Sequence, residues 1–392
     1  MGSKFRYLII VLFFSFARLS GQTDLNFQLA DSVTYRYYIS GMWTELIELG
    51  ERAVEEGIDY KYLRQRIGYA YYMKGDYVRA GMNFEKALKS DTYDPFTLAY
   101  LSFTNSKLME TAKSGYYASR LSKESRNTYQ IKTTKIIEDI DFELSKKFPS
   151  TSLRSNPGYY RLGLGSIPFA RLKLYQSVSA FNQYLTIRYP TQASEFKTRQ
   201  FEYYGSAAYA LLANWSVKAA YHFLYTDYSS SVTYSNLGYF GLSANYNILN
   251  VTAEGSFLEN SLVTVKQAGL RTGIRFPGYA GFTLTSGIAM VNMEDENNLV
   301  FNESIYFRIN AKTWMEGEVA WGNMDYYNDY DALYVYNSID PLSFRGRFTT
   351  YYLAGSRVTI YVSLGLEEKK YYETDIYKYN QFSFLGGIRW QL

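Results

Sequence analysis

The sequence predicts a multidomain fold in which an α-helical part precedes a closed antiparallel β-barrel of about twelve strands. Before residue 150, hydrophobic residues recur at spacings of three and four, which is typical of helices that bury one face. After residue 150, apolar and polar residues alternate in segments separated by Asn, Gly, Asp and Ser, which is typical of strands. Aromatic residues make up 19% of the chain, and the abundant Tyr favours strands and membrane interfaces.

The N-terminal residues have the order of a secretory signal peptide. Lys4 and Arg6 precede an apolar stretch over residues 7–16, and small or polar residues follow. This order is typical of a segment that is removed after export, and the stretch is too short for a stable spanning helix. We expect residues 1–21 to be the signal peptide. Cleavage after Ala17 and a retained anchor helix are the alternatives.

Composition excludes several classes of function. The net charge of +4 is too small for a chain of this length to indicate nucleic-acid binding. Cys is absent and His occurs once, so we expect no disulfide framework, no lipid-anchored N-terminus, no metal site and no cofactor.

A short segment after Phe148 is rich in residues that interrupt helices and strands, and it predicts a boundary between two domains. Two Pro residues with Ser, Asn and Gly lie close together there, as in a linker. We therefore expect a helical part over 22–148, a linker over 149–157 and a barrel over 158–392.

One window of the helical part carries a repeat signature. Small residues stand where two helices of a unit would cross closely, and large rings stand where they would fill the space beside the crossing. The signature residues are Ile67, Gly68, Tyr71, Gly75, Ala80, Phe84 and Ala87. A weaker copy precedes this window and a more degenerate one begins at Pro95. We expect a helix over 132–147 to complete the array.

These residues resemble the tetratricopeptide repeat, a helix–turn–helix unit of about 34 residues. The resemblance implies stacked helix pairs with a concave groove that captures an extended peptide or a partner helix. A generic bundle of helical hairpins is the alternative.

The strands of the second part carry charge on their polar phase. In the strand that begins at Trp215, apolar residues at odd positions alternate with mostly polar ones, and the last strand alternates in the same way up to Leu392. Apolar outside and charged inside is typical of a barrel in lipid, where only a closed sheet satisfies the backbone. The predicted lumen residues are Glu202, Lys218, His222, Arg308, Glu318, Arg345, Arg347 and Arg389. A periplasmic β-sandwich is the alternative.

The connections between strands are expected to alternate between tight turns and long loops. Tight turns are predicted at 213–214, 259–260 and 354–356. Long extracellular loops are predicted at 293–298, 324–341 and 368–377.

The C-terminus resembles the terminal targeting pattern of bacterial outer-membrane barrels. The residues that carry this resemblance are Phe384, Ile388, Trp390 and Leu392. The family pattern usually ends in an aromatic residue, so Leu392 departs from it. The resemblance implies recognition by the outer-membrane assembly machinery.

Two questions about the lumen stay open at this level. Arg and Glu side chains could line an anion-selective channel or could pair and plug the interior, and we favour a plugged or narrow lumen. His222 with Glu202 and Ser206 could form a lipid-modifying site in which a hydroxyl attacks an ester. Three such common residue types are a weak signal, and a structural role for His222 is favoured.

The whole arrangement resembles the repeat-plus-barrel outer-membrane proteins of Bacteroidetes-type bacteria, including the YaiO-like group. The resemblance implies an outer-membrane location with the repeats in the periplasm. We expect a non-enzymatic scaffold that binds a periplasmic or envelope protein of an envelope, secretion or polysaccharide-export system, with outer-membrane lipid around the barrel. A narrow channel or transporter is the alternative.

Overall fold

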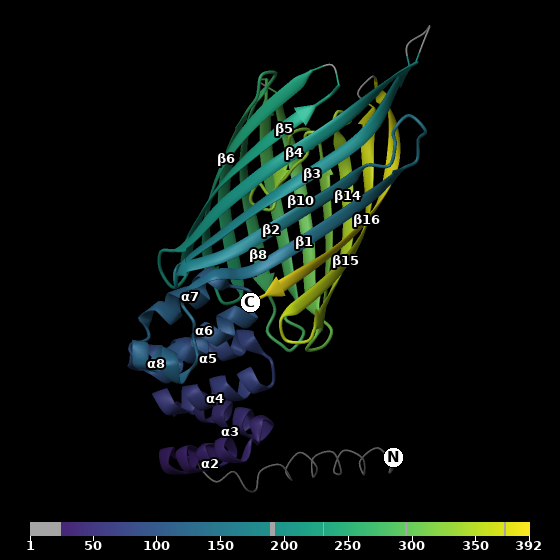
Figure 1. Ribbon diagram of the computed structural model, residues 1–392. Helices are drawn as coiled ribbons and strands as arrows, with labels where there is room; N and C mark the ends of the chain where they lie inside the picture. Colours follow the sequence, from purple (N-terminus) through teal and green to yellow (C-terminus); the bar gives the residue numbers. More distant parts are fainter. Residues whose placement is uncertain (1–24, 189–192, 230, 295, 372–373) are drawn as a thin grey trace, which may run out of the picture.

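The computed structural model describes residues 25–188, 193–229, 231–294, 296–371 and 374–392. The predicted signal peptide at 1–21 lies outside the described residues. Helices stack in a column below one end of a tall barrel, and the chain ends at that same end of the barrel (Figure 1).

The helical part consists of three helix pairs and a short final helix among the described residues. The helices are α2 (Phe27–Ser40), α3 (Trp43–Glu55), α4 (Lys61–Met73), α5 (Tyr77–Ser90), α6 (Pro95–Lys107), α7 (Thr111–Arg120) and α8 (Lys123–Thr128). The first helices of the pairs begin at residues 27, 61 and 95, and the second helices begin at 43, 77 and 111. Each unit is therefore repeated after 34 residues. We call residues 27–128 the helical module.

Local sequence explains where these helices begin and end. The side chains of Asn26, Asp76 and Asp94 each accept a hydrogen bond from a backbone N–H in the first turn of the helix that follows. Gly41 and Gly75 have φ of 69° and 78°, a backbone conformation that favours glycine and ends the preceding helix.

The signature residues meet in the core of the middle unit. Ile67, Ala80, Phe84 and Ala87 are fully buried. A methyl group built on Gly68 would lie 3.0–3.2 Å from ring carbons of Phe84, so α4 and α5 cross here at the closest approach that the ring allows.

Fourteen antiparallel strands of the described residues close into a single barrel. They are β1 (Lys135–Pro149), β2 (Gly158–Phe169), β3 (Leu172–Arg188), β4 (Ala193–Ala210), β5 (Trp215–Asp227), β6 (Val232–Tyr246), β7 (Leu249–Glu259), β8 (Thr264–Arg275), β9 (Thr283–Met293), β10 (Glu296–Arg308), β11 (Thr313–Gly322), β14 (Leu342–Ala354), β15 (Val358–Tyr371) and β16 (Thr374–Gln391). Pairing of β1 with β16, in which Ile140 lies opposite Trp390, closes the sheet.

The prediction of about twelve strands was too low, and the helix predicted over 132–147 was wrong. Residues 135–149 form β1, in which Ile140, Phe142 and Leu144 face outward while Asp139, Asp141 and Glu143 are buried inside. The many charged residues of this segment led to the prediction of a helix, although its acidic residues stand at every second position, as in a strand. The barrel therefore begins at Lys135 rather than at residue 158. Residues 150–157 connect β1 to β2 and do not link the two parts.

Two of the predicted long loops are mostly strand. β9 and β10 continue to Met293 and from Glu296, so most of 293–298 lies in their hairpin. β15 and β16 likewise extend into the predicted loop 368–377. Polar and Tyr-rich residues continue these strands beyond the apolar zone. The third loop, 324–341, is a long connection.

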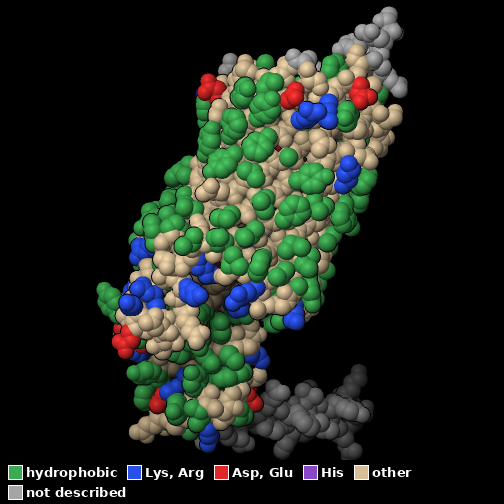
Figure 2. All heavy atoms as spheres, viewed as in Figure 1, with side chains coloured by type: hydrophobic (Ala, Val, Ile, Leu, Met, Phe, Trp, Pro, Cys, Tyr) green, Lys and Arg blue, Asp and Glu red, His purple; other side chains and the backbone are tan. Residues whose placement is uncertain are grey.

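The outer surface of the barrel is a broad apolar band (Figure 2). Phe384, Ile388 and Trp390 of β16 are 40–49% exposed, and outward residues of the other strands are similar. An apolar surface of this extent on a closed sheet is typical of contact with lipid. No helix among the described residues is long and apolar enough to cross a membrane.

The close crossing at Gly68 predicts a matched pair of substitutions. Gly68→Ala should destabilise the helical module by about 1–2 kcal/mol, because the buried Phe84 ring has no space to move. Gly81→Ala should be neutral or stabilising, because its methyl group would meet Thr104 at 3.6 Å and helix propensity would improve. Thermal unfolding followed at 222 nm on the full chain checks this. Equal melting temperatures of the two variants would contradict the packing argument.

Candidate functional site

The long loop 323–341 fills the upper lumen of the barrel, away from the helical module, and we call it the plug loop. It contains a small hairpin of β12 (Asn328–Asp329) and β13 (Tyr334–Val335). Its side chains contact strands around the barrel, including β1 through Glu143, β5 through Lys218 and β14 through Arg347. The sequence predicted an extracellular loop here. The loop does leave the barrel at the end opposite the helical module, but it then turns into the lumen, where its polar tip finds charge partners.

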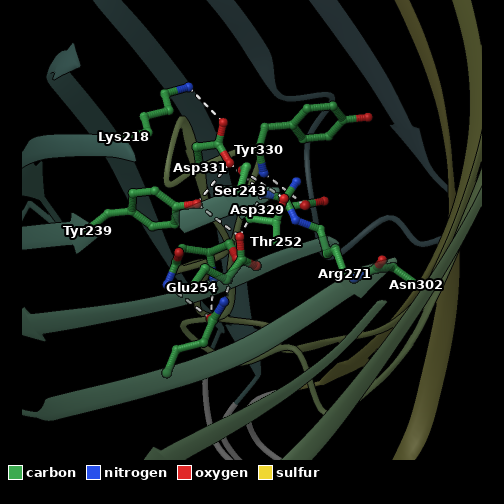
Figure 3. A network of polar contacts seen from close by, with 12 residues as sticks. Lys218, Tyr239, Ser243, Thr252, Glu254, Arg271, Asn302, Asp329, Tyr330 and Asp331 are labelled. Atoms are coloured by element: carbon green, nitrogen blue, oxygen red, sulfur yellow. Dashed lines mark hydrogen bonds and ion pairs between the residues drawn. The ribbon is translucent and has the colours of Figure 1, made fainter. Parts of the chain in front are cut away.

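Asp331 is the centre of the plug loop's ionic contacts (Figure 3). Its carboxylate accepts hydrogen bonds from Lys218 Nζ at 2.7 Å, from the Tyr239 hydroxyl at 2.9 Å and from Arg271. Arg271 also donates to Glu254 at 2.7 Å. One loop carboxylate thus pairs with cations of β5 and β8, and the wall supplies the charge that balances it.

A second layer of contacts within the plug loop is apolar. Met324, Tyr327 and Ala332 are buried against inward-facing side chains of the wall. These wall residues are Leu237, Leu258, Val265, Ala289, Val291, Val300 and Ala320. Part of the upper lumen is therefore a hydrophobic core. Removal of the plug loop would expose these side chains to water at a cost of about 25 cal/mol per Å².

Seven of the eight predicted lumen residues lie inside the barrel. Arg347 pairs with Glu318 at 2.6 Å, and Arg345 pairs with Asp329 of the plug loop at 2.7 Å. Arg389 pairs with Asp139 at 2.7 Å. Lys218 meets Asp331, and Glu202 meets His222.

Arg308 is the exception among the predicted lumen residues. It ends β10 at the barrel rim, where it donates to the carbonyl of Gly75 in the helical module at 2.7 Å. Its guanidinium lies over the rings of Tyr77 and Tyr279. Arg308 lines the large cavity below the plug loop, but it does so at the rim, against the helical module, rather than deep in the barrel.

His222 joins the wall to the plug loop. Its Nδ1 lies 2.8 Å from the carbonyl of Ala332, and its Nε2 lies 3.3 Å from Glu202. Ser179, not Ser206, donates to Glu202, at 2.7 Å. Among the described residues, no serine hydroxyl bonds the imidazole, which is 1% exposed. This geometry gives no support to attack on a lipid ester.

A large cavity, about 1570 Å³ in volume and lined by both charged and aromatic side chains, lies between the plug loop and the helical module. We call it the lower cavity. Its wall contains internally matched charges: Arg161 donates to Glu143 at 3.0 Å, and Lys173 lies 2.8 Å from Glu138. Four Tyr hydroxyls donate to wall carboxylates at 2.9–3.1 Å, from Tyr175, Tyr334, Tyr351 and Tyr361.

The helical module is attached to the lower rim of the barrel by polar contacts. Glu85 accepts from Asn247 at 2.7 Å and pairs with Lys113 at 2.8 Å. Arg275 pairs with Glu110, and Arg171 donates to Ser119 at 2.9 Å. Because α7 contacts strands β3, β4 and β5, the last unit forms part of the cavity floor.

Aromatic rings connect the first helices of the three units. The rings of Tyr38, Tyr69 and Tyr100 follow one another from α2 to α6 with centroids 5.2 Å apart at each step. Tyr72 contacts Tyr100 and Tyr77, and Tyr77 meets Arg308 of the barrel. We call this row the ring ladder. Since α2 contacts α4 and α4 contacts α6, it follows the side on which the first helices adjoin.

At the end of the helical module away from the barrel, the charges on this side are paired with one another. Asp31 accepts from Tyr60 at 2.7 Å and from Arg66 at 2.8 Å, and these hydrogen bonds lower the pKa of its carboxyl. Burial and the bond to Asp31 raise the pKa of Tyr60 to about 12. Exposed rings of Tyr35 and Tyr62 lie nearby, with Arg66 over Tyr35 and Lys61 over Tyr62.

Sequence reasoning missed the acidic residues of β1 and the Asp331 centre. The alternation of Asp139, Asp141 and Glu143 with apolar residues was the available signal for β1. No local pattern marks Asp331, because its partners lie 60 and 113 positions away along the chain.

Comparisons with known proteins give structural neighbours only. No family model matches the chain, and no curated protein does. A solved structure titled bacterial polysaccharide outer membrane secretin is 8% identical, with a TM-score of 0.42, over 66% of this chain and 99% of that one. The CymD monoaromatic hydrocarbon channel is 12% identical, with a TM-score of 0.45, over 67% and 90%. The Acinetobacter baumannii outer membrane protein Omp33 is 11% identical, with a TM-score of 0.38, over 66% and 99%. Likeness at this level assigns no function.

The Asp331 contacts predict a loss of barrel stability on substitution. Asp331→Ala should destabilise the barrel by about 3 kcal/mol, because Lys218 and Arg271 would lose their shared carboxylate in a nearly closed lumen. The temperature at which the unheated barrel band on a detergent gel shifts to the unfolded position measures this. Glu259→Ala, at an exposed carboxylate, is the control. If both variants shift at the wild-type temperature, the plug loop is not held by Asp331.

Proposed function

We propose that this protein is an outer-membrane barrel that anchors a periplasmic protein-interaction module and conducts no solute by itself. The observation that carries the proposal is the plug loop, whose apolar side completes a hydrophobic core in the upper lumen. A gate must leave its pore at small cost, whereas Met324, Tyr327 and Ala332 of this loop are almost fully buried.

The apolar band and the connections support the membrane assignment and its orientation. Connections at the helical end are short, the longest being 276–282, and the other end carries 323–341. Bacterial barrels have short periplasmic turns and longer extracellular loops. The helical module therefore belongs in the periplasm. Lipid covers Phe384, Ile388 and Trp390, and these residues are also the proposed signal to the assembly machinery.

The helical module is proposed to consist of tetratricopeptide-type units. The 34-residue repeat of both helices supports this, together with the buried signature residues around Gly68. Arrays of such units bind extended segments of other proteins along the side formed by their first helices. Exposed Tyr35 and Tyr62 on α2 and α4 supply contact area there. The partner is an envelope protein, in keeping with a scaffold role in an envelope, secretion or polysaccharide-export system.

A narrow channel is the second candidate, and the lower cavity favours it. A space of about 1570 Å³, lined by charged and aromatic side chains, reaches from the helical module up to the tip of the plug loop. If the loop moved, that space would extend through the barrel. The apolar side of the loop is what weighs against this candidate.

Electrical recording separates the two candidates. The purified full chain in planar lipid bilayers should give no stepwise conductance, because the plug loop fills the upper lumen. A matched variant in which a Gly-Ser linker replaces residues 325–338 tests whether the loop is the barrier. Steady conductance of the wild-type chain would contradict the anchor proposal.

Photo-crosslinking in intact cells tests the interaction module. A photoreactive residue at Tyr62 should yield a discrete adduct with another envelope protein, because this exposed ring lies on the first helix of its unit. The same residue at Lys89, exposed on the second helix of that unit, is the control. Adducts at Lys89 equal to those at Tyr62, or none at either position, would overturn the scaffold proposal.

A further inference from the structure

The lower cavity is closed above and lined below by the helical module. The plug loop forms its roof through Tyr330, Asp331 and Tyr334, and residues of α6 and α7 form its floor. The ring ladder leads to it, because Tyr77 and Phe103 belong both to the cavity lining and to the aromatic contacts of the module. A space that ends at a fixed roof suits the end of a ligand better than a passing solute.

The carboxylates on the wall of the lower cavity have partners, whereas some cations at its mouth, where the helical module meets the barrel rim, have no carboxylate partner among the described residues. Each of its lining side-chain carboxylates accepts a hydrogen bond from, or pairs with, a wall cation or a Tyr hydroxyl. Leu392 at the end of the chain also lines the cavity, and it accepts a hydrogen bond from Lys135 at 3.1 Å. Lys107 of α6, Lys132 of the segment before β1 and Arg357 of the β14–β15 turn also line the cavity. Among the described residues these three have no carboxylate partner. Lys and Arg side chains gather where the helices meet the barrel (Figure 2). The mouth therefore attracts anions.

The wall chemistry narrows the class of anion. Lining rings include Trp314, stacked on Tyr351 with centroids 5.4 Å apart, and Tyr175, Tyr204 and Tyr361. The carbon-bound hydrogens of a sugar ring carry partial positive charge and stack on the negative face of an aromatic ring. Fixed guanidinium–carboxylate pairs next to those rings offer donors and acceptors side by side. Sugar hydroxyls, which donate and accept at once, match such pairs.

An extended peptide fits this cavity less well. A peptide enters a sheet protein most readily by pairing with a free strand edge. All fourteen strands of the described barrel are paired on both sides, so the cavity wall offers no such edge. The hydrogen-bonding groups of the wall are side chains held in pairs. Such pairs suit the hydroxyls of a ligand better than the regularly spaced N–H and C=O groups of a peptide backbone.

We propose that the lower cavity binds the end of an acidic sugar chain, with sugar rings against the Tyr and Trp faces and carboxylates at Lys107, Lys132 and Arg357. This site is separate from the exposed Tyr35 and Tyr62 of the scaffold proposal. It goes beyond that proposal and rests only on the closed roof that both share.

Titration of the full chain in detergent with three probes tests this. The probes are a tetrasaccharide of glucuronic acid, a neutral glucose tetrasaccharide and an octapeptide of alternating Glu and Gly. Calorimetry should show the glucuronate binding at least about tenfold more tightly than the other two. Tryptophan emission should change with it, and Trp314→Phe should remove that change because Trp314 lines the cavity. Tighter binding of the peptide, equal binding of both sugars, or binding of none would overturn the proposal.

Charge reversal at the mouth locates the site. The double variant Lys107→Glu with Arg357→Glu should weaken glucuronate binding by about tenfold or more and leave thermal stability unchanged, since neither cation has a carboxylate partner among the described residues. Lys89→Glu, on α5 outside the cavity lining, is the matched control and should change affinity less than about twofold. Equal weakening by both would assign the effect to net charge and sink the proposal. Loss of glucuronate binding with Tyr62 crosslinking intact would leave the scaffold proposal standing.

Discussion

Pairing of β1 with β16 is the constraint on which the rest of the structure depends. A sheet that crosses lipid must satisfy every backbone N–H and C=O within itself, so its first and last strands must meet. They do so over residues 139–149 and 381–391, in antiparallel register. Closure also brings the start of β1 and the end of β16 to one rim (Figure 1). The helical module, which precedes β1 directly, must therefore lie beneath that rim, and its contacts through Arg275, Arg308 and Asn247 hold it there.

A closed sheet of fourteen strands leaves an interior too wide for wall side chains alone to fill. The plug loop fills the upper half of this interior. Met324, Tyr327 and Ala332 pack against an apolar part of the wall, and Asp331 pairs with the cations of β5 and β8. The ionic contacts fix where the loop sits, and the apolar contacts of Met324, Tyr327 and Ala332 add hydrophobic free energy that favours the same position. Buried charge pairs alone are weak evidence of stability, because desolvation offsets much of their attraction.

Local patterns in the sequence predicted the parts of this structure that depend on local chemistry. Strict alternation from Trp215 onward predicted strands, and Gly68 with Phe84 predicted a close helix crossing. β1 was missed because its Asp and Glu residues imitate a helix surface, although their alternation with Ile140 and Phe142 was visible. The sequence did not predict that loop 324–341 turns into the lumen. Whether a polar loop extends into water or turns into a lumen depends on partners such as Lys218 and Arg271, which lie on other strands.

The lower half of the lumen holds an open cavity with a charged wall, whereas the plug loop fills the upper half. If the plug loop closes the barrel, as we propose, the paired charges and Tyr hydroxyls below it are not needed for closure. Holding Arg161, Glu143 and Asp141 together at a cavity wall costs desolvation free energy that an apolar wall would avoid. A polar wall of this kind is favourable where a polar ligand completes its hydrogen bonds. The upper lumen is filled by the plug loop, whose apolar cluster around Tyr327 lies beside buried charge pairs such as Arg154–Asp340, whereas the lower lumen is an open cavity lined by aromatic rings. On this contrast we propose two roles within one barrel: the upper half closes it, and the lower half binds a ligand.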